Sequence, residues 1–335
     1  MPAFNKLSPR AMGVAAAVVT VLIWTSFIVI ARASADPARG GVLTPFDITL
    51  ARLFGAGAVL LPLGWWIARR DRAAGAGSSS LFGLSPLPLR VTCVTGLFAG
   101  LLYALLAYSG FVYAPAGHAS VLLPGSLPLW TTLLALLFLG TRITRARALG
   151  LVLILLGGAL VGGSSLLHAL EGGDVWKGDL LFMLAALCWS TYSVLVRRHA
   201  LEAVRATAAI TAFGFLAFVP LYLALLATGA VQGQFFHAPW RDVWFQILFQ
   251  GLGSVAISGV TFTRMIQYYG PVRSTMITAL VPGLSALAAV LFLGEPLAWN
   301  LLLGLALVTA GIVFGVRSVA PSALLSPVAA GRPRG

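Results

Sequence analysis

The sequence predicts an all-α integral membrane protein with ten transmembrane helices arranged as two inverted five-helix repeats. Three observations predict this fold: the apolar composition, the alternation of basic residues between successive loops, and an internal repeat with an odd number of spans. Of the 335 residues, 59% are hydrophobic and 9% are charged, and the mean hydropathy is +0.96. Soluble proteins carry roughly 25% charged residues, so the composition excludes a soluble enzyme, a disordered chain and a nucleic-acid-binding domain.

Ten segments are long and apolar enough to cross a bilayer, which requires about 20 predominantly apolar residues. A segment in lipid must satisfy its own backbone hydrogen bonds, so each of these segments is expected to be a helix. The third and fourth segments follow one another closely, and Pro115 and Gly117 supply the turn between them. The expected spans are 12–31, 45–68, 91–110, 116–139, 148–167, 178–196, 206–228, 243–268, 272–293 and 298–316.

The basic residues indicate an orientation, because Lys and Arg concentrate in cytoplasmic loops. If the N-terminus is cytoplasmic, ten spans return the C-terminus to the cytoplasm, and sixteen of the 22 basic residues lie inside. These sixteen are Lys6, Arg10, Arg69, Arg70, Arg72, Arg90, Arg142, Arg145, Arg147, Arg197, Arg198, Arg205, Arg273, Arg317, Arg332 and Arg334. The expected location is the inner (cytoplasmic) membrane of a bacterium, and the net charge of +13 reflects topology rather than nucleic-acid binding.

The two halves of the chain resemble each other. Residues 137–140 and 291–294 both read Leu-Phe-Leu-Gly, and the same offset pairs Ser120 with Ser274 and Pro128 with Pro282. The first repeat is expected at 12–167, the second at 178–316, and a cytoplasmic tail at 317–335. Five spans per repeat mean that the second copy enters the membrane from the opposite side, and such inverted repeats build many secondary transporters.

Several stretches in this order resemble the drug/metabolite transporter superfamily, specifically its ten-helix EamA-like exporters. The stretches include Leu-Ile-Trp-Thr-Ser-Phe at 22–27, Ala-Arg-Leu-Phe at 51–54, and Gly-Pro at 270–271 through Gly-Glu-Pro at 294–296. The resemblance covers residues 12 to 316 and implies a secondary transporter with no cofactor, which moves a small molecule across the lipid bilayer. Thr141 stands where the family usually has Glu, and Arg52 has no counterpart in the second half.

Two arginines fall inside expected spans, where ionisable groups usually face a cavity. Arg52 is about 12 Å from its helix start at 1.5 Å per residue, so it either ties helices together or contacts the substrate. Arg264 either snorkels to the inner headgroups or continues a polar face formed by Ser254, Ser258 and Thr261. A guanidinium facing the central cavity could bind a carboxylate through two hydrogen bonds.

Aromatic and histidine side chains complete the predicted cavity. Trp24 and Trp189 are in mid-span and related by the repeat, so they are expected to line the cavity or to pack between helices rather than to anchor the interface. His118 is either a hydrogen-bonding residue at a helix end or a site of proton coupling. The residues expected to bind substrate are Trp24, Tyr103, His118, Trp189, Tyr192, Ser258, Thr261 and Arg264, with Arg52 either structural or substrate-binding.

No Asp or Glu lies in the middle third of any expected span, which argues against cation/proton antiport. The sequence therefore favours export of amino acids, aromatic or large neutral, or of related compounds by alternating access. A translocator of drugs or of lipid-linked sugars is the alternative. An intramembrane enzyme is disfavoured, because no nucleophile–base set, carboxylate pair or metal cluster is present in the sequence. The oligomeric state, the substrate and the coupling ion stay open.

Overall fold

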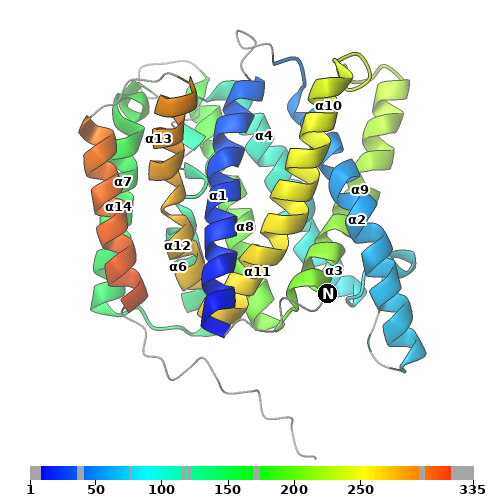
Figure 1. Cartoon of the computed structure of the whole chain (residues 1–335), viewed down its shortest axis with the longest axis horizontal. Coiled ribbons are helices and arrows are strands. Elements are labelled where there is room, and N and C mark those ends of the chain that lie inside the picture. The colour runs from blue at the N-terminus through cyan, green and yellow to red at the C-terminus, as the bar shows by residue number, and fades with distance from the viewer. Residues whose placement is uncertain are drawn as a thin grey trace, which may run out of the picture.

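The computed structural model describes residues 9–35, 41–75, 77, 79–114, 118–119, 122–168, 174–293 and 299–317. Across these residues the regular structure is helical, apart from an isolated bridge between Ser80 and Ser85. The long helices run side by side in one bundle (Figure 1). Its first half contains α1 (Pro9–Ala35), α2 (Pro45–Ala73), the 3₁₀ turn η3 (Leu81–Gly83), α3 (Leu89–Thr95), the π-helical η4 (Gly96–Leu102), α4 (Tyr103–Tyr113), α6 (Leu127–Leu139) and α7 (Arg145–His168).

The second half contains α8 (Val175–Arg198), α9 (Ala203–Ala227), α10 (Trp240–Gln246), the π-helical η5 (Ile247–Ile257), α11 (Ser258–Tyr269), α12 (Pro271–Thr278), α13 (Val281–Leu293) and α14 (Trp299–Arg317). Over the described residues, seven helical stretches are long and apolar enough to cross a membrane, and 127–139 and 302–315 are shorter apolar helices. The fold is therefore that of a multi-pass helical membrane protein, and the count of ten spans stays a prediction. The expected tail at 317–335 lies outside the described residues after Arg317.

Two of the expected spans are broken rather than continuous. The fourth, expected at 116–139, has a turn at 123–126, and its main helix α6 begins only at Leu127. Pro124 and Pro128 lack backbone N–H groups, so neither can continue the helical hydrogen bonding. The ninth is broken at Ala279 and Leu280, between α12 and α13. Non-helical backbone at membrane depth is tolerated where it is buried in protein or lines a cavity, so both breaks indicate such a place.

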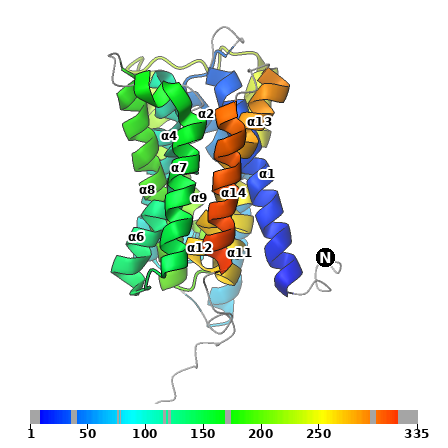
Figure 2. The same ribbon diagram turned by 90° about the vertical axis from the view of Figure 1, so that its left-hand side faces the viewer.

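Glycines allow the closest helix crossings. A Cβ added to Gly55 of α2 would collide with the carbonyl of Ile247 in η5, and one added to Gly214 of α9 would lie 2.7 Å from the carbonyl of Gly100 in η4. Figure 2 brings α7 and α14 to the front, where they pack along most of their length. Small residues at such crossings let backbones approach and gain dispersion contacts that lipid cannot supply.

Polar contacts tie α2 to α9 at both ends of the bundle. At one end the buried Asp47 forms a capping box with Thr44, and its carboxylate accepts hydrogen bonds from Tyr222 Oη and the Gln234 backbone N–H, both at 2.9 Å. At the other end Arg205 of α9 makes a two-pronged ion pair with Asp71 of α2. These contacts hold α2 against α9 while apolar and glycine contacts fill the space between the two ends.

Candidate substrate site

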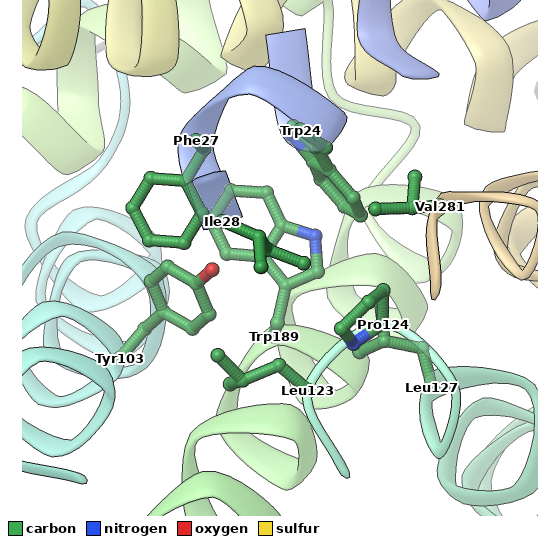
Figure 3. Close-up of a pocket in the computed structure, with 9 residues that line it drawn as sticks. All are labelled: Trp24, Phe27, Ile28, Tyr103, Leu123, Pro124, Leu127, Trp189 and Val281. Atoms are coloured by element: carbon green, nitrogen blue, oxygen red, sulfur yellow. The ribbon is translucent and has the colours of Figure 1, made fainter. Parts of the chain in front are cut away.

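A narrow cavity, with room for about one water molecule, lies between α1, α4, α8 and the two broken helices. Figure 3 shows its lining, with the ring of Tyr103 and the indole of Trp189 turned toward the space beside Ile28. The lining residues are Trp24, Phe27, Ile28, Tyr103, Leu123, Pro124, Leu127, Trp189 and Val281. Both helix breaks thus reach the same cavity, one through Leu123 and Pro124 and the other through Val281.

Trp189 is the centre of an aromatic cluster on one wall of this cavity. Its ring lies 4.8 Å from Tyr103, 5.8 Å from Trp24 in an edge-to-face arrangement, and 5.6 Å from Phe262, measured between centroids. Aromatic pairs at 4.5 to 7 Å are favourable beyond their burial alone. Because the rings touch, a solute larger than a few atoms can enter only if α1 and α8 move apart or the rings change rotamer.

The two indole nitrogens of this cluster differ in their hydrogen bonding. Trp24 Nε1 donates to Ser258 Oγ at 3.2 Å, and Ser258 in turn donates to the Ser254 carbonyl at 2.7 Å. Trp189 is only 4% exposed, and its Nε1 has no hydrogen-bond partner among the described residues. A buried donor without a partner is rare in native proteins, because leaving it unpaired costs free energy. Trp189 Nε1 is therefore available to a bound solute.

Trp189 also lines a second, equally narrow cavity, together with Arg52 and Ser254. Arg52 is 5% exposed, and its Nη1 donates to Ser254 Oγ at 3.2 Å and to Tyr108 Oη at 3.4 Å. Among the described residues, no carboxylate lies within ion-pair distance of this guanidinium. The second cavity therefore carries a buried, positively charged guanidinium that donates to hydroxyl groups and that no carboxylate among the described residues neutralises.

Ser254 of the predicted polar face lines the second cavity, but Ser258 and Thr261 of that face pack against α1. Ser258 Oγ accepts the hydrogen bond from Trp24 Nε1, and Thr261 Oγ1 lies 2.8 Å from Thr20 Oγ1. The hydroxyl groups of Ser258 and Thr261 therefore have hydrogen-bond partners on α1. Neither Ser258 nor Thr261 is among the residues that line the two cavities. Arg264 is half-buried, lies in neither lining, and has no hydrogen bond or ion pair within the described part of the chain.

Two other predicted residues are buried beside the cavities. Tyr192 is fully buried behind Trp189, with ring centroids 5.4 Å apart, and its Oη lies 2.8 Å from Thr263 Oγ1. His118 is 1% exposed, and its Nδ1 lies 2.7 Å from Asp179 Oδ1 in the first turns of α8. This pair ties the connection between α4 and α6 to the start of α8, away from the cavity lining.

Several cavity residues were not predicted from the sequence. Leu127 and Val281 are related by the same offset that pairs Pro128 with Pro282, so the repeat signal could have identified them. Phe27 and Ile28 follow Trp24 by one helical turn and could have been placed on the same face. Gln250, whose Oε1 accepts from Tyr108 Oη at 2.9 Å, was detectable as an amide in an apolar span.

Comparison with known proteins shows the family of the chain. The model of the EamA-like transporter family matches residues 11–163 and again residues 176–317. A curated relative from Streptantibioticus cattleyicolor, described as a "probable terminal-alkyne amino-acid exporter", is 31% identical over 309 residues, which cover 89% of this chain and 91% of that protein.

A crystal structure of a protein that carries no functional description shares the fold. It superposes with a TM-score of 0.66 and 21% identity, covering 91% of this chain and 97% of the other. The family and the curated relative both point to a transporter and not to an enzyme. The chain is a multi-pass membrane transporter that belongs to the EamA-like transporter family of the drug/metabolite transporter superfamily.

Proposed function

We propose that this transporter exports amino acids, aromatic or large neutral ones preferentially, or closely related carboxylate solutes. The observation that carries the proposal is the buried guanidinium of Arg52, which lines a cavity without a carboxylate partner among the described residues. A buried charge is costly unless it is paired, so an anionic group of the substrate is the natural partner. Arg presents several N–H groups in a plane, which match the two oxygens of a carboxylate.

The aromatic cavity next to Arg52 supports an apolar or aromatic side chain. Trp189 lines both cavities, so a solute with its carboxylate at Arg52 could place its side chain among Trp24, Tyr103 and Trp189. Ligand sites typically combine mostly apolar walls with a few polar groups that fix orientation. The curated relative is named as an amino-acid exporter, which supports amino acids as the substrate class.

Inverted five-helix repeats at 12–167 and 178–316 are part of the proposal, and symmetric contacts support them. An offset of 154 relates Gly150 to Gly304 and Gly157 to Gly311. The observed contacts cross over, because Gly150 meets Gly311 and Gly157 meets Gly304, as a two-fold axis between α7 and α14 would require.

Two further features relate the two halves, the first of them through a slightly different offset. The repeat-related Trp24 and Trp189 touch each other, and the two helix breaks occur at equivalent positions. Substrate sites of inverted-repeat transporters lie where the repeats meet and often use discontinuous helices. The position of the aromatic cavity between the proposed repeats supports alternating access, in which exchange of conformation between the halves would open the cavity to one side and then the other.

We further propose ten spans in the inner membrane with both termini cytoplasmic. Reporter fusions after Gly75 and after Gly173 are expected to report opposite sides, cytoplasmic for Gly75 and periplasmic for Gly173, because three spans separate them. Alkaline phosphatase and a cytoplasmic fluorescent reporter provide complementary signals. A common side for both fusions would contradict the topology, whatever the substrate.

Trp189→Phe tests the unpaired indole donor. The ring and most of the packing are retained, so we expect the melting temperature to change little, while affinity for an amino acid falls about two- to tenfold with the loss of one neutral hydrogen bond. Thermal-shift titration of the purified protein measures both quantities. Trp24→Phe is the matched control, because its Nε1 already bonds Ser258 within the protein. Equal affinity losses in the two variants would contradict a role for Trp189 Nε1.

The transport assay itself uses purified protein in liposomes loaded with a labelled amino acid. Carboxylate solutes with aromatic or large apolar side chains are expected to move faster than their amides and faster than quaternary ammonium drugs. Preference for organic cations would overturn the proposal. A proton gradient applied in the same assay tests coupling, for which the His118–Asp179 pair is the candidate because His titrates near neutral pH.

A further inference from the structure

A groove opens between the C-terminal half of α2 and the first turn of α9. Leu63, Trp66, Ile67 and Arg70 recur on α2 at spacings of three and four residues, so they lie on one helix face. Val204 and Arg205 close the groove from α9. One end of the groove is thus apolar and the other carries arginine, and this lining is distinct from that of the two cavities around Trp189.

The groove lies at the depth of a membrane interface. Twenty residues from Pro45, at 1.5 Å each, span the roughly 30 Å of hydrocarbon and end at Trp65 and Trp66. Both tryptophans are exposed, as expected for side chains at the headgroup level. The last two turns of α2, roughly, continue beyond this level, and Figure 1 shows the lower end of α2 reaching past its neighbours.

The charge at this end of α2 is positive and only partly neutralised. Arg69, Arg70 and Arg72 lie together there, and the carboxylate of Asp71 is occupied by both Nη atoms of Arg205. Arg70 is exposed, its guanidinium lies 5.7 Å from the Trp66 ring centroid, and it makes no ion pair within the described residues. Within the part of the chain that the structure describes, Arg70 is therefore a cation at the polar end of the groove that has no ion-pair partner.

The turn that follows α2, between Ser80 and Ser85, exposes an aromatic side chain. Leu81 and Phe82 have φ values of 51° and 58°, a region that costs non-glycine residues backbone energy, and Phe82 is 94% exposed. The bridge between Ser80 and Ser85 maintains this turn. A phenyl ring presented in this way is stabilised if it enters the interfacial layer of a bilayer, which agrees with the depth assigned to the tryptophans.

We propose that this groove binds an anionic phospholipid of the cytoplasmic leaflet, with an acyl chain along Leu63, Trp66 and Ile67 and the phosphate at Arg70. The apolar stretch and the free arginine match the two parts of such a lipid, and basic pockets between helices on the cytoplasmic side favour anionic headgroups. The inference rests on the proposed orientation, because only the cytoplasmic leaflet presents its headgroups to this end of α2 in that orientation.

The test is a thermal-shift titration of the full-length protein in detergent with phosphatidylglycerol or with phosphatidylcholine of the same acyl chains. We expect phosphatidylglycerol to raise the melting temperature at lower concentration than phosphatidylcholine. Arg70→Gln should weaken the phosphatidylglycerol response about fivefold, as about 1 kcal/mol per basic residue near the surface implies, and Arg70→Lys should keep most of it. Arg145→Gln is the matched control, since Arg145 is also exposed and expected on the cytoplasmic side, but it begins α7 on the opposite flank of the bundle from α2.

Three results would overturn the proposal: equal responses to the two lipids, an equal loss in Arg145→Gln and Arg70→Gln, or an equal response to glycerol 3-phosphate, which has the anionic group without chains. Native mass spectrometry of lipid adducts provides a second measurement if Arg70→Gln melts too early for titration. The readout is lipid binding rather than flux, so a failure here leaves the proposed amino-acid export standing. A failure of export leaves the lipid site standing in the same way.

Discussion

Arg52→Gln is expected to weaken binding and transport of a carboxylate solute about 10- to 100-fold, because hydrogen bonds to a charged group contribute about 1.5–3 kcal/mol each. The amide or ester of the same solute should be affected far less, since it offers the guanidinium no negative charge. Arg52 is buried beside Trp189 and bonds only the hydroxyl groups of Ser254 and Tyr108 among the described residues. Paired flux measurements with an amino acid and its amide give the ratio directly.

Protein stability separates a binding role of Arg52 from a structural one. A buried charge without an acidic partner opposes folding, so its replacement by neutral Gln should leave the melting temperature unchanged or raise it. A lower melting temperature, with equal losses for the acid and the amide, would mean that Arg52 only ties α2 to Tyr108 and Ser254.

Arg264→Gln is the matched comparison for the same charge change. Arg264 lines neither cavity, so its replacement should affect the acid and the amide equally. If Arg264→Gln selectively lost carboxylate transport while Arg52→Gln did not, the carboxylate of the substrate would bind at the inner end of α11 rather than at Arg52.

Gly55→Ala is expected to destabilise the protein by about 1–3 kcal/mol or more, because the added Cβ would collide with the backbone carbonyl of Ile247. A backbone atom cannot rotate away as a side chain can, so α2 and η5 would have to separate. The measurement is thermal unfolding in detergent, with transport of the folded fraction as a second readout.

Gly253→Ala in η5 controls for the chemistry of the substitution. The nearest atom to its added Cβ is 4.0 Å away, in the ring of Phe249. Alanine also favours helix more than glycine does, so this variant should melt at the same temperature or higher. If both variants lost equal stability, the destabilisation would come from the backbone preferences of this π-helical segment rather than from the crossing of α2.

Helix positions were largely predictable from hydropathy, which depends on local sequence. The seventh span was expected at 206–228, and α9 covers Ala203–Ala227. Among the unbroken helices described, the largest end error is at α2, expected to end at 68 and observed to end at Ala73. Arg69 to Arg72 lower the hydropathy without breaking the helix, because the chain there leaves the hydrocarbon but keeps its backbone hydrogen bonds.

The candidate site was only partly predictable. Trp24, Tyr103 and Trp189 were predicted and line the aromatic cavity. The polar face of Ser258 and Thr261 was predicted, but the helix that it contacts was not. Its hydrogen-bond partners, the Thr20 hydroxyl and the Trp24 indole, lie on α1, more than 230 residues away in sequence.

By itself, therefore, the sequence determined the helical membrane class, the transporter family and the mid-membrane aromatic and arginine residues. These follow from composition, from local hydropathy and from motifs that each occupy a few neighbouring residues. Only the tertiary structure decided which donors stay unpaired, that Arg52 lacks a carboxylate neighbour within the described residues, and that the helix breaks at Pro124 and Ala279 adjoin the same cavity. Hydrogen-bond satisfaction and charge pairing depend on which residues from distant spans come into contact, and helix packing, rather than local sequence, decides those contacts.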